Sequence, residues 1–244
     1  MALTLRRPGS RNQIAEADSR EERKYPFPAA RASLLTAWLD ARLPRDPQYP
    51  VGIVTSCYYD TPQLDAYQES ADGELRKQKL RLRWYGEPID PYAGVWLEIK
   101  TRDGVRSSKQ RYRYPISGAA NALGLAIPRR RELAAWLTEL SASVGAPLDP
   151  TMEPTALVRY GRIRWQSSDR QVRAALDTEV CAAAPSGAPI WLPIPDGSVL
   201  ELKSAGDLPP QMEQLGRLGL RRTAHSKYAL AVERLYGGDR PPTR

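Results

Sequence analysis

The sequence predicts an α+β fold, in which a mostly antiparallel sheet curls or closes into a barrel and a few helices lie outside it. Three observations support this fold class. Several short segments alternate ionic and apolar residues with a period of two, as β-strands do. Other segments carry apolar residues at helical spacing. Twenty-two prolines punctuate the chain, which favours many short elements separated by turns.

The alternating segments place long ionic side chains on one face of each predicted strand. In KLRLRWY, Lys79, Arg81 and Arg83 share one face, and Leu80 and Leu82 lie on the other. A more apolar strand, GIVTSCYYD, ends at a turn signal, so Asp60 and Thr61 are expected to serve in a turn and cap. The same alternation occurs in residues 21–27, 95–100, 109–114, 159–165, 172–177 and 199–203.

Helices are predicted where apolar residues recur every three or four positions. The two longer ones cover Ala29–Leu43 and Arg130–Leu140, and shorter ones lie near Pro210–Leu218 and Ser226–Leu235. The apolar stripe of the first helix consists of Leu34, Leu35, Trp38, Leu39 and Leu43.

One domain is expected over residues 21–236. Residues 1–20 form a polar, charged and aperiodic segment, which we expect to be a disordered basic tail, and residues 237–244 have the same character. No apolar run is long enough to span a bilayer, and the first residues lack the apolar stretch of a signal peptide. We therefore expect a cytoplasmic protein.

The charge of the chain favours an anionic partner. The net charge is +8, and the stretch from Arg76 to Arg113 holds 11 Lys or Arg against 4 Asp or Glu. With two cysteines and one histidine, a disulfide framework, a zinc site and Ser-His-Asp catalysis are poor candidates. Nucleic acid, a membrane surface and a phosphorylated small molecule remain as partner classes.

A solvent-exposed polar face would explain any single strand, but it explains the whole set less well. Side chains two positions apart on a strand lie roughly 7 Å apart. Two like charges at that distance repel by roughly 2 kcal/mol at an effective dielectric constant near 20. If helices cover the apolar face, the ionic face points inward and must stay wet and bind an anion. The sequence therefore predicts a cavity lined with cations.

The acidic residues on the same face have two interpretations. Glu98, Glu201 and Asp177 balance nearby cations, or they hold Mg²⁺ or Mn²⁺, which take carboxylate and phosphate oxygens. Neither G-x-x-x-x-G-K-[ST] nor a G-x-G-x-x-G following a strand occurs, so arginine and lysine side chains would have to bind the phosphates. The pattern thus points to a triphosphate or polyphosphate bound with a divalent metal.

These segments resemble the catalytic domain of the vacuolar transporter chaperone (VTC) complex, a polyphosphate polymerase. That family belongs to the triphosphate tunnel metalloenzymes, together with the CYTH-type triphosphatases. The resemblance covers roughly residues 21–236. Its motifs occur in the family's order: ERKY at 22–25, SCYYDT at 56–61, RLRWYG at 81–86, LEIK at 97–100, the basic run at 109–113, RYGR at 159–162, VRAALD at 172–177, LELK at 200–203 and SKY at 226–228.

The resemblance implies a closed eight-stranded antiparallel tunnel with flanking helices. It implies transfer of the γ-phosphate of ATP to a growing polyphosphate chain, with Glu201 as ligand of Mg²⁺ or Mn²⁺. Tyr160, Arg111 and Glu98 complete the expected substrate-binding residues, with Glu98 also balancing nearby cations. The residues implied to contact phosphate are Lys24, Arg81, Arg83, Lys100, Lys109, Arg162, Arg173, Lys203 and Lys227.

The chain departs from its relatives at two points. Where CYTH enzymes show E-x-E-x-K, only E-R-K remains, at Glu22–Lys24, which weakens the triphosphatase alternative. The SPX domain and membrane helices of the eukaryotic complex do not occur, so coupling to translocation would need a separate membrane partner. A non-catalytic polyphosphate-binding module stays open. Nucleic-acid binding is disfavoured, because inward carboxylates would repel that backbone.

Overall fold

The computed structural model describes residues 13–16, 21–87, 94–103, 106–114, 137, 148–186, 188–209, 212 and 214–237. These residues form one antiparallel sheet of ten strands in the order β1-β6-β5-β4-β3-β7-β8-β10-β2, with β9 paired to β8. The strands are β1 Gln13–Glu16, β2 Glu21–Pro26, β3 Val51–Asp60, β4 Arg76–Tyr85, β5 Val95–Asp103, β6 Arg106–Tyr114, β7 Glu153–Gln166, β8 Val172–Ala183, β9 Leu192–Pro193 and β10 Val199–Ser204.

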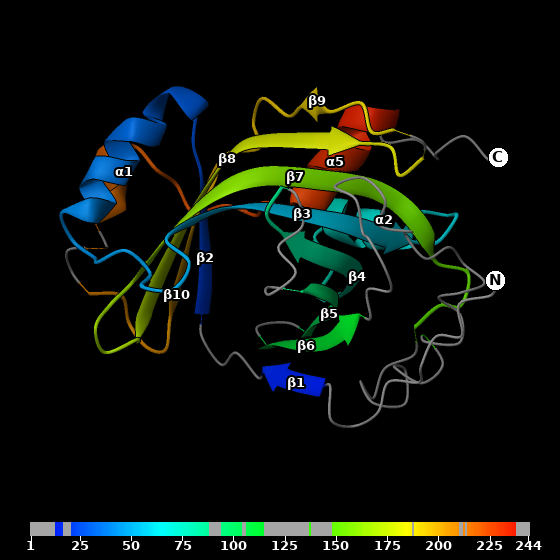
Figure 1. Ribbon diagram of the computed structural model, residues 1–244, viewed down its shortest axis with the longest axis horizontal. Coiled ribbons are helices and arrows are strands. Elements are labelled where there is room, and N and C mark those ends of the chain that lie inside the picture. The colour runs from blue at the N-terminus through cyan, green and yellow to red at the C-terminus, as the bar shows by residue number, and fades with distance from the viewer. Residues whose placement is uncertain are drawn as a thin grey trace.

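The sheet is curled into an open half-barrel. In Figure 1, β3, β7 and β8 run as long arcs, with β4, β5 and β6 descending on one side and β10 and β2 on the other. The expected antiparallel α+β architecture is confirmed, and the eight longer strands cover the seven alternating segments and the more apolar segment that forms β3. The two additional strands, β1 and β9, have four and two residues, too few for a period of two to stand out.

The expectation of a closed barrel is wrong, because among the described residues the terminal strands β1 and β2 do not pair with each other. The edges of β6 and β2, which a closed eight-stranded ring would join, have other partners. β1 pairs with the outer edge of β6, and the amide of Thr223 donates to the carbonyl oxygen of Lys24 in β2 at 3.1 Å. An edge strand that is already hydrogen-bonded cannot also complete the ring.

The N-terminal segment differs in part from its expected character. Residues 13–16, inside the predicted loose tail, form β1. The rest of residues 1–20, and residues 238–244, lie outside the described residues.

The helices that the structure describes are η2 Ala29–Arg31, α1 Ala32–Asp40, α2 Asp65–Ala71, η3 Gln214–Leu218 and α5 Lys227–Tyr236. Apart from α2, which the sequence does not predict, they lie close to the predicted positions. Leu35 and Leu39 of α1 are buried as expected, but Leu34 is 56% exposed. The helix expected at 130–140 falls outside the described residues apart from Leu137, which is buried. Within the described part of the chain, no helix is long and apolar enough to cross a membrane.

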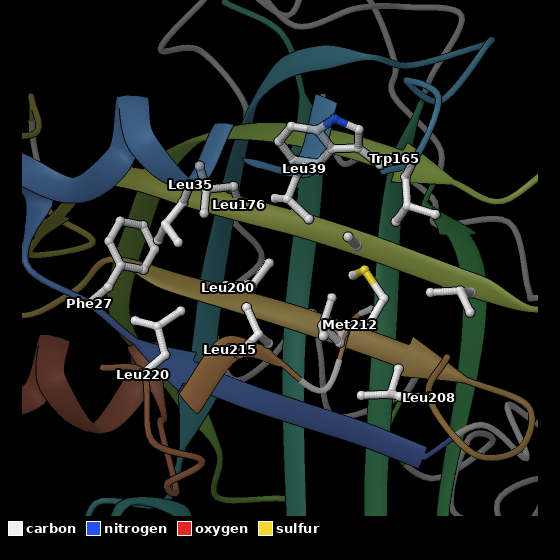
Figure 2. Close-up of a cluster of buried hydrophobic side chains, with 14 residues drawn as sticks. Phe27, Leu35, Leu39, Trp165, Leu176, Leu200, Leu208, Met212, Leu215 and Leu220 are labelled. Carbon is white, nitrogen blue, oxygen red and sulfur yellow. The ribbon is translucent and has the colours of Figure 1, made fainter. Parts of the chain in front are cut away.

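Apolar side chains cover the convex face of the sheet, as the alternation predicts. Under α1 and η3, Leu176 of β8 and Leu200 of β10 pack against Leu35, Leu39 and Leu215, as Figure 2 shows. A second cluster on the same face joins β3 to β6 and includes Leu80, Leu82, Leu97, Ile99 and Tyr112. The ionic side chains of the same strands therefore line the concave face.

One end of the concave face is apolar and is covered by α5. Tyr58 of β3 and Tyr160 of β7 pack there with Ala231 and Val232 of α5. The ring of Tyr228 stacks on that of Tyr58 with centroids 5.1 Å apart. This packing leaves the first turn of α5 beside the ionic part of the concave face.

Candidate functional site

The strand register brings cations from β4, β5 and β6 into neighbouring rows on the concave face. Lys79, Lys100 and Lys109 occupy one row across the three strands. The next row holds Arg81 of β4 and Arg111 of β6, on either side of Glu98 in β5. Because alternate residues share a face, these rows follow directly from the period of two in the sequence.

Glu98 is the centre of the first ion cluster, which we call the Glu98 cluster: Glu98, Arg81, Arg83, Lys109 and Arg111. Oε2 of Glu98 lies 2.7 Å from Arg81 and 3.6 Å from Arg83. Oε1 lies 3.2 Å from Lys109 and 2.9 Å from Arg111. Burial alone would raise the pKa of Glu98, but the four cations hold that pKa well below its usual range. The carboxylate is therefore ionised among a surplus of positive charge.

The two arginines of β4 are fixed by further contacts with neighbouring strands. Arg83 donates to the hydroxyls of Ser56 at 3.0 Å and Tyr160 at 3.2 Å. Arg81 donates to the Tyr58 hydroxyl at 3.1 Å. These contacts connect the cluster to β3 and β7, so the guanidinium groups are held in fixed orientations.

A second cluster joins β7, β8, β10 and α5, and we call it the Arg162 cluster: Arg162, Asp177, Glu201 and Lys227. Arg162 binds Asp177 through two nitrogens, each at 2.6 Å, and Glu201 at 2.9 Å. Lys227 lies 2.5 Å from Asp177 and 3.2 Å from Glu201. Burial would raise the pKa of Glu201, but Lys227, Arg162 and other cations lower it well below its usual range. The two cations and the two carboxylates of this cluster have equal and opposite total charge.

Glu22 of β2 joins the two ends of the curled sheet. Its carboxylate lies 2.8 Å from Lys100 of β5, 3.6 Å from Lys203 of β10 and 3.9 Å from Lys24. β5 and β2 lie far apart in the strand order, so the pair with Lys100 spans the concave face. We call the space enclosed by the concave face the trough. Ion pairs across the trough thus connect strands that share no backbone hydrogen bonds.

The start of α5 also faces this region. Lys79 donates to Oγ of Ser226 at 2.8 Å, and that oxygen accepts from the amide of Ala229 as the helix cap. Lys24 donates to the carbonyl oxygen of His225 at 3.0 Å. Burial, with Lys227 and Lys24 nearby, lowers the pKa of His225 to about 4, so its ring is neutral near pH 7.

The concave face as a whole is strongly cationic. Four carboxylates, Glu22, Glu98, Asp177 and Glu201, lie among the described residues of the face. Ten cations contact them or lie beside them: Lys24, Lys79, Arg81, Arg83, Lys100, Lys109, Arg111, Arg162, Lys203 and Lys227. Such a surplus in a concave surface requires anions from solution for balance.

The structure brings most of the expected site residues together. Arg173 is in register with Lys203 and so shares its face, but its side chain is exposed at the end of β8 and belongs to neither ion cluster. The roles assigned to all these residues remain predictions. The other expected residues on the concave face are Lys24, Arg81, Arg83, Lys100, Lys109, Arg162, Lys203, Lys227, Tyr160, Arg111, Glu98 and Glu201.

Further residues of the face are not among those expected at the site, and they include Glu22, Lys79, Ser56, Tyr58 and Ser226. Ser56 and Tyr58 bind Arg83 and Arg81, and Ser226 accepts from Lys79. Ser56 and Tyr58 are two positions apart in β3, where the many apolar residues make the period of two hard to recognise. A search for that period would have found them.

The carboxylates of the concave face fit a metal ion whose remaining ligands are phosphate oxygens and water. Glu201 and Glu22 lie on the adjacent strands β10 and β2. Burial and the charge of Glu201 would raise the pKa of Glu22, but Lys24, Lys100 and Lys203 lower it well below its usual range. In the described ranges, no group of three His, Cys, Asp or Glu side chains could hold a metal ion. Mg²⁺ commonly takes one or two carboxylates and completes its shell with phosphate oxygens and water. These residues therefore fit such an ion, and do not form an all-protein cage.

Asp60 fixes the position of α5 without entering the ionic face. Its carboxylate is fully buried and accepts from the amides of Thr61, Ala66 and Tyr67 at 2.8, 2.9 and 3.0 Å, and from the hydroxyl of Tyr228. The expected turn and cap role of Asp60 is confirmed. Because Tyr228 follows Lys227, this contact also helps to place the ammonium group in the Arg162 cluster.

Comparisons with known proteins identify a family over most of the chain. The sequence model of the VTC domain matches residues 19–236, which include every strand from β2 to β10 and the whole of α5. No curated protein gives a significant match. Solved structures do match, at low identity.

Three of these structures cover most of both chains. A "putative adenylate cyclase" from Bacillus halodurans is 11% identical, with a TM-score of 0.45 over 92% of this chain and 93% of that chain. The PH1012 protein from Pyrococcus horikoshii OT3 is 12% identical, with a TM-score of 0.45 over 86% and 98%. A protein of the same name as the first, from Vibrio parahaemolyticus, is 14% identical, with a TM-score of 0.43 over 90% and 97%.

Proposed function

Because this chain belongs to the VTC domain family, we propose that it is a polyphosphate polymerase, which transfers the γ-phosphate of ATP to a growing polyphosphate chain and depends on Mg²⁺ or Mn²⁺. The observation that carries the proposal is the concave face itself. Ten cations from strands β2, β4, β5, β6, β7 and β10 and helix α5 gather there around four carboxylates. A polyanion of several phosphates matches that surplus.

Catalysis of this kind rests on positioning and on charge. Phosphoryl transfer places negative charge on the equatorial oxygens of the transferred group, and fixed cations stabilise that charge. Arg81 and Arg83 are suited to this role because hydroxyls of Tyr58, Ser56 and Tyr160 hold them in place. Their rigid guanidinium groups need little reorganisation during the reaction.

The lysines suit binding of the remainder of the chain. Lys24, Lys100 and Lys203 surround Glu22, and an incoming phosphate would compete with this carboxylate for them. When bound at Glu201, with Glu22 beside it, the metal would supply charge neutralisation and orientation of the phosphate oxygens. Both carboxylates are ionised near neutral pH, since neighbouring cations lower their pKa values.

The location and partners of the protein belong to the same proposal. ATP is a cytoplasmic substrate, so we place the reaction in the cytoplasm, where the domain could also lie against a membrane. We also propose a membrane protein as a partner that moves the product across the membrane.

A polymer assay tests the proposal. With ATP and Mn²⁺, the wild type is expected to form acid-labile polyphosphate and ADP in equal phosphate equivalents. Arg83→Ala and Glu201→Ala should each lower the rate of polymer formation about tenfold or more, because each loses a group that acts on the transferred phosphate. Polymer length on gels and ADP release provide the two readouts.

The control is Arg76→Ala, on the same strand β4. The Arg76 side chain is 85% exposed and pairs only loosely with Asp103 at 3.5 Å, so its loss should leave the rate unchanged. Release of inorganic phosphate without polymer would identify a triphosphatase instead. Tight polyphosphate binding without turnover in Mg²⁺ or Mn²⁺ would identify a binding module.

A further inference from the structure

Glu98 is enclosed by cations to a degree that separates it from the other carboxylates of the concave face. Glu98 contacts four cations, whereas Glu22 contacts three, and Asp177 and Glu201 contact two each among the described residues. Its side chain is 1% exposed and that of Asp177 is 0% exposed, whereas those of Glu201 and Glu22 are 12% and 22% exposed. Each of its two oxygens contacts two cations, Arg81 and Arg83 on one side and Lys109 and Arg111 on the other. A substrate or metal has no open approach to these oxygens.

The register explains why this position matters. Arg81 and Arg111 lie directly opposite Glu98 on the two neighbouring strands. Arg83 lies two residues from Arg81 along β4, and Lys109 lies two residues from Arg111 along β6. Without the carboxylate, four positive groups would surround an empty centre. Like charges about 7 Å apart repel by roughly 2 kcal/mol per pair at an effective dielectric constant near 20. The most flexible member, Lys109, would then turn away or lose its proton.

We propose that Glu98 is a positioning residue, whose buried carboxylate acts as a permanent counter-ion that holds Arg81, Arg83, Lys109 and Arg111 in the arrangement that binds phosphate. The inference rests on the proposed function, since it concerns the same cationic face. It differs from a direct substrate contact, because Glu98 touches only the groups that would touch the substrate. It also assigns the metal to the opposite side of the trough, at Glu201.

The charges that face Lys109 define the pH dependence that a test should use. Burial has the largest effect on the pKa of Lys109 and lowers it. The charge of Glu98 raises this pKa, and Arg81, Arg83 and Arg111 lower it, so that the pKa is about 8. Lys100 on β5 and Glu16 on β1 occupy the register positions opposite Lys109. Loss of the Glu98 charge therefore lowers the pKa of Lys109 further.

Binding of tripolyphosphate in EDTA, measured by calorimetry for the wild type and Glu98→Gln at pH 6 and pH 8, tests this role. The variant has one more positive charge, so simple charge counting predicts tighter binding. A positioning role predicts that Glu98→Gln binds about tenfold more weakly at pH 8, equal to one lost charge. The deficit should shrink at pH 6, because a lower pH favours protonation of Lys109 in both proteins.

Glu98→Asp, which keeps the charge, should recover part of the affinity. If Glu98→Gln does not fold, Glu98→Gln/Arg111→Gln, which removes one cation together with the acid, should fold and still bind weakly at pH 8. Equal or tighter binding by the neutral variants at pH 8 would overturn the role of Glu98. Failure of the wild type itself to bind tripolyphosphate would instead reject the proposed function.

Discussion

Arg162→Ala is expected to lower the free energy of unfolding by about 3–5 kcal/mol, because it removes one member of a buried ion cluster and leaves its carboxylates in place. Asp177 is fully buried and would lose both of its contacts with the guanidinium group. Glu201 would keep only Lys227 among its close partners in this cluster. Urea unfolding followed by circular dichroism measures the loss.

Arg164→Ala is the matched control for this change. Arg164 lies two positions further along β7, and its guanidinium donates only to the carbonyl oxygen of Tyr49 among the interactions described for it. Burial and the nearby charge of Arg162 lower the pKa of Arg164, so its removal relieves repulsion. Its loss should change the free energy of unfolding by less than about 1 kcal/mol.

A double variant separates the cost of an unpaired charge from the loss of packing. Arg162→Ala/Asp177→Ala removes both partners, so it should be more stable than Arg162→Ala alone, although two side chains are missing. If the double variant loses the sum of the two single effects, the cluster is not a coupled network. A loss below about 1 kcal/mol for Arg162→Ala would likewise contradict the buried ion cluster.

Polyphosphate affinity is expected to fall about 100-fold between pH 7 and pH 9, because two lysines of the face lose their protons in this range. Burial lowers the pKa of Lys79 to about 8, with a smaller effect of nearby lysines, while Tyr58 opposes it. Burial also lowers the pKa of Lys109 to about 8. An anion binds the protonated form, so each lysine should cost about tenfold in affinity as the pH rises past its pKa.

Lys109→Arg provides the control, because a guanidinium group stays protonated throughout this range. Its affinity should fall about tenfold instead of about 100-fold between the two pH values. Terminal phosphates of the ligand gain charge over the same range, which acts equally on both proteins. Calorimetry in buffers of different ionisation enthalpy should show proton uptake on binding at pH 8. A rising affinity with pH, or proton release, would contradict these lysine pKa values.

The period of two in the sequence was sufficient to predict which side chains share a face. Lys79, Arg81 and Arg83 alternate with leucines, and the leucines are fully buried on the convex side. Strand pairing then places residues of the same parity in rows, so Glu98 between Arg81 and Arg111 follows from register alone. Seven of the eight longer strands could be predicted from this period and β3 from its apolar run, whereas the helices at either end of the chain could be predicted from apolar residues every three or four positions.

Closure of the sheet could not be predicted, because it depends on what pairs with the edge strands. β1 has four residues and no alternation, yet it occupies the edge of β6. The segment around Thr223, which has no strand pattern, bonds to β2. Such edge partners are chosen by tertiary packing, and local sequence carries little signal for them.

The pairing of individual acids was equally beyond the sequence. Glu98, Asp177 and Glu201 all follow the same alternation, but Glu98 meets four cations, and Asp177 and Glu201 share Arg162 and Lys227. Lys227 comes from a helix, so no strand pattern could place it. The sequence thus identified the cationic face, and only the fold distinguishes its two clusters.

Titration of tripolyphosphate into the wild type and into variants from opposite sides of the trough is the most direct test of a single shared anion site. Lys109→Ala on β6 and Lys203→Ala on β10 lie far apart in the strand order, and Arg76→Ala lies outside the face. The account predicts one bound tripolyphosphate per chain, with affinity lowered about tenfold by each of the first two variants and unchanged by the third. Several weak, independent sites, or an effect confined to one side of the sheet, would contradict it.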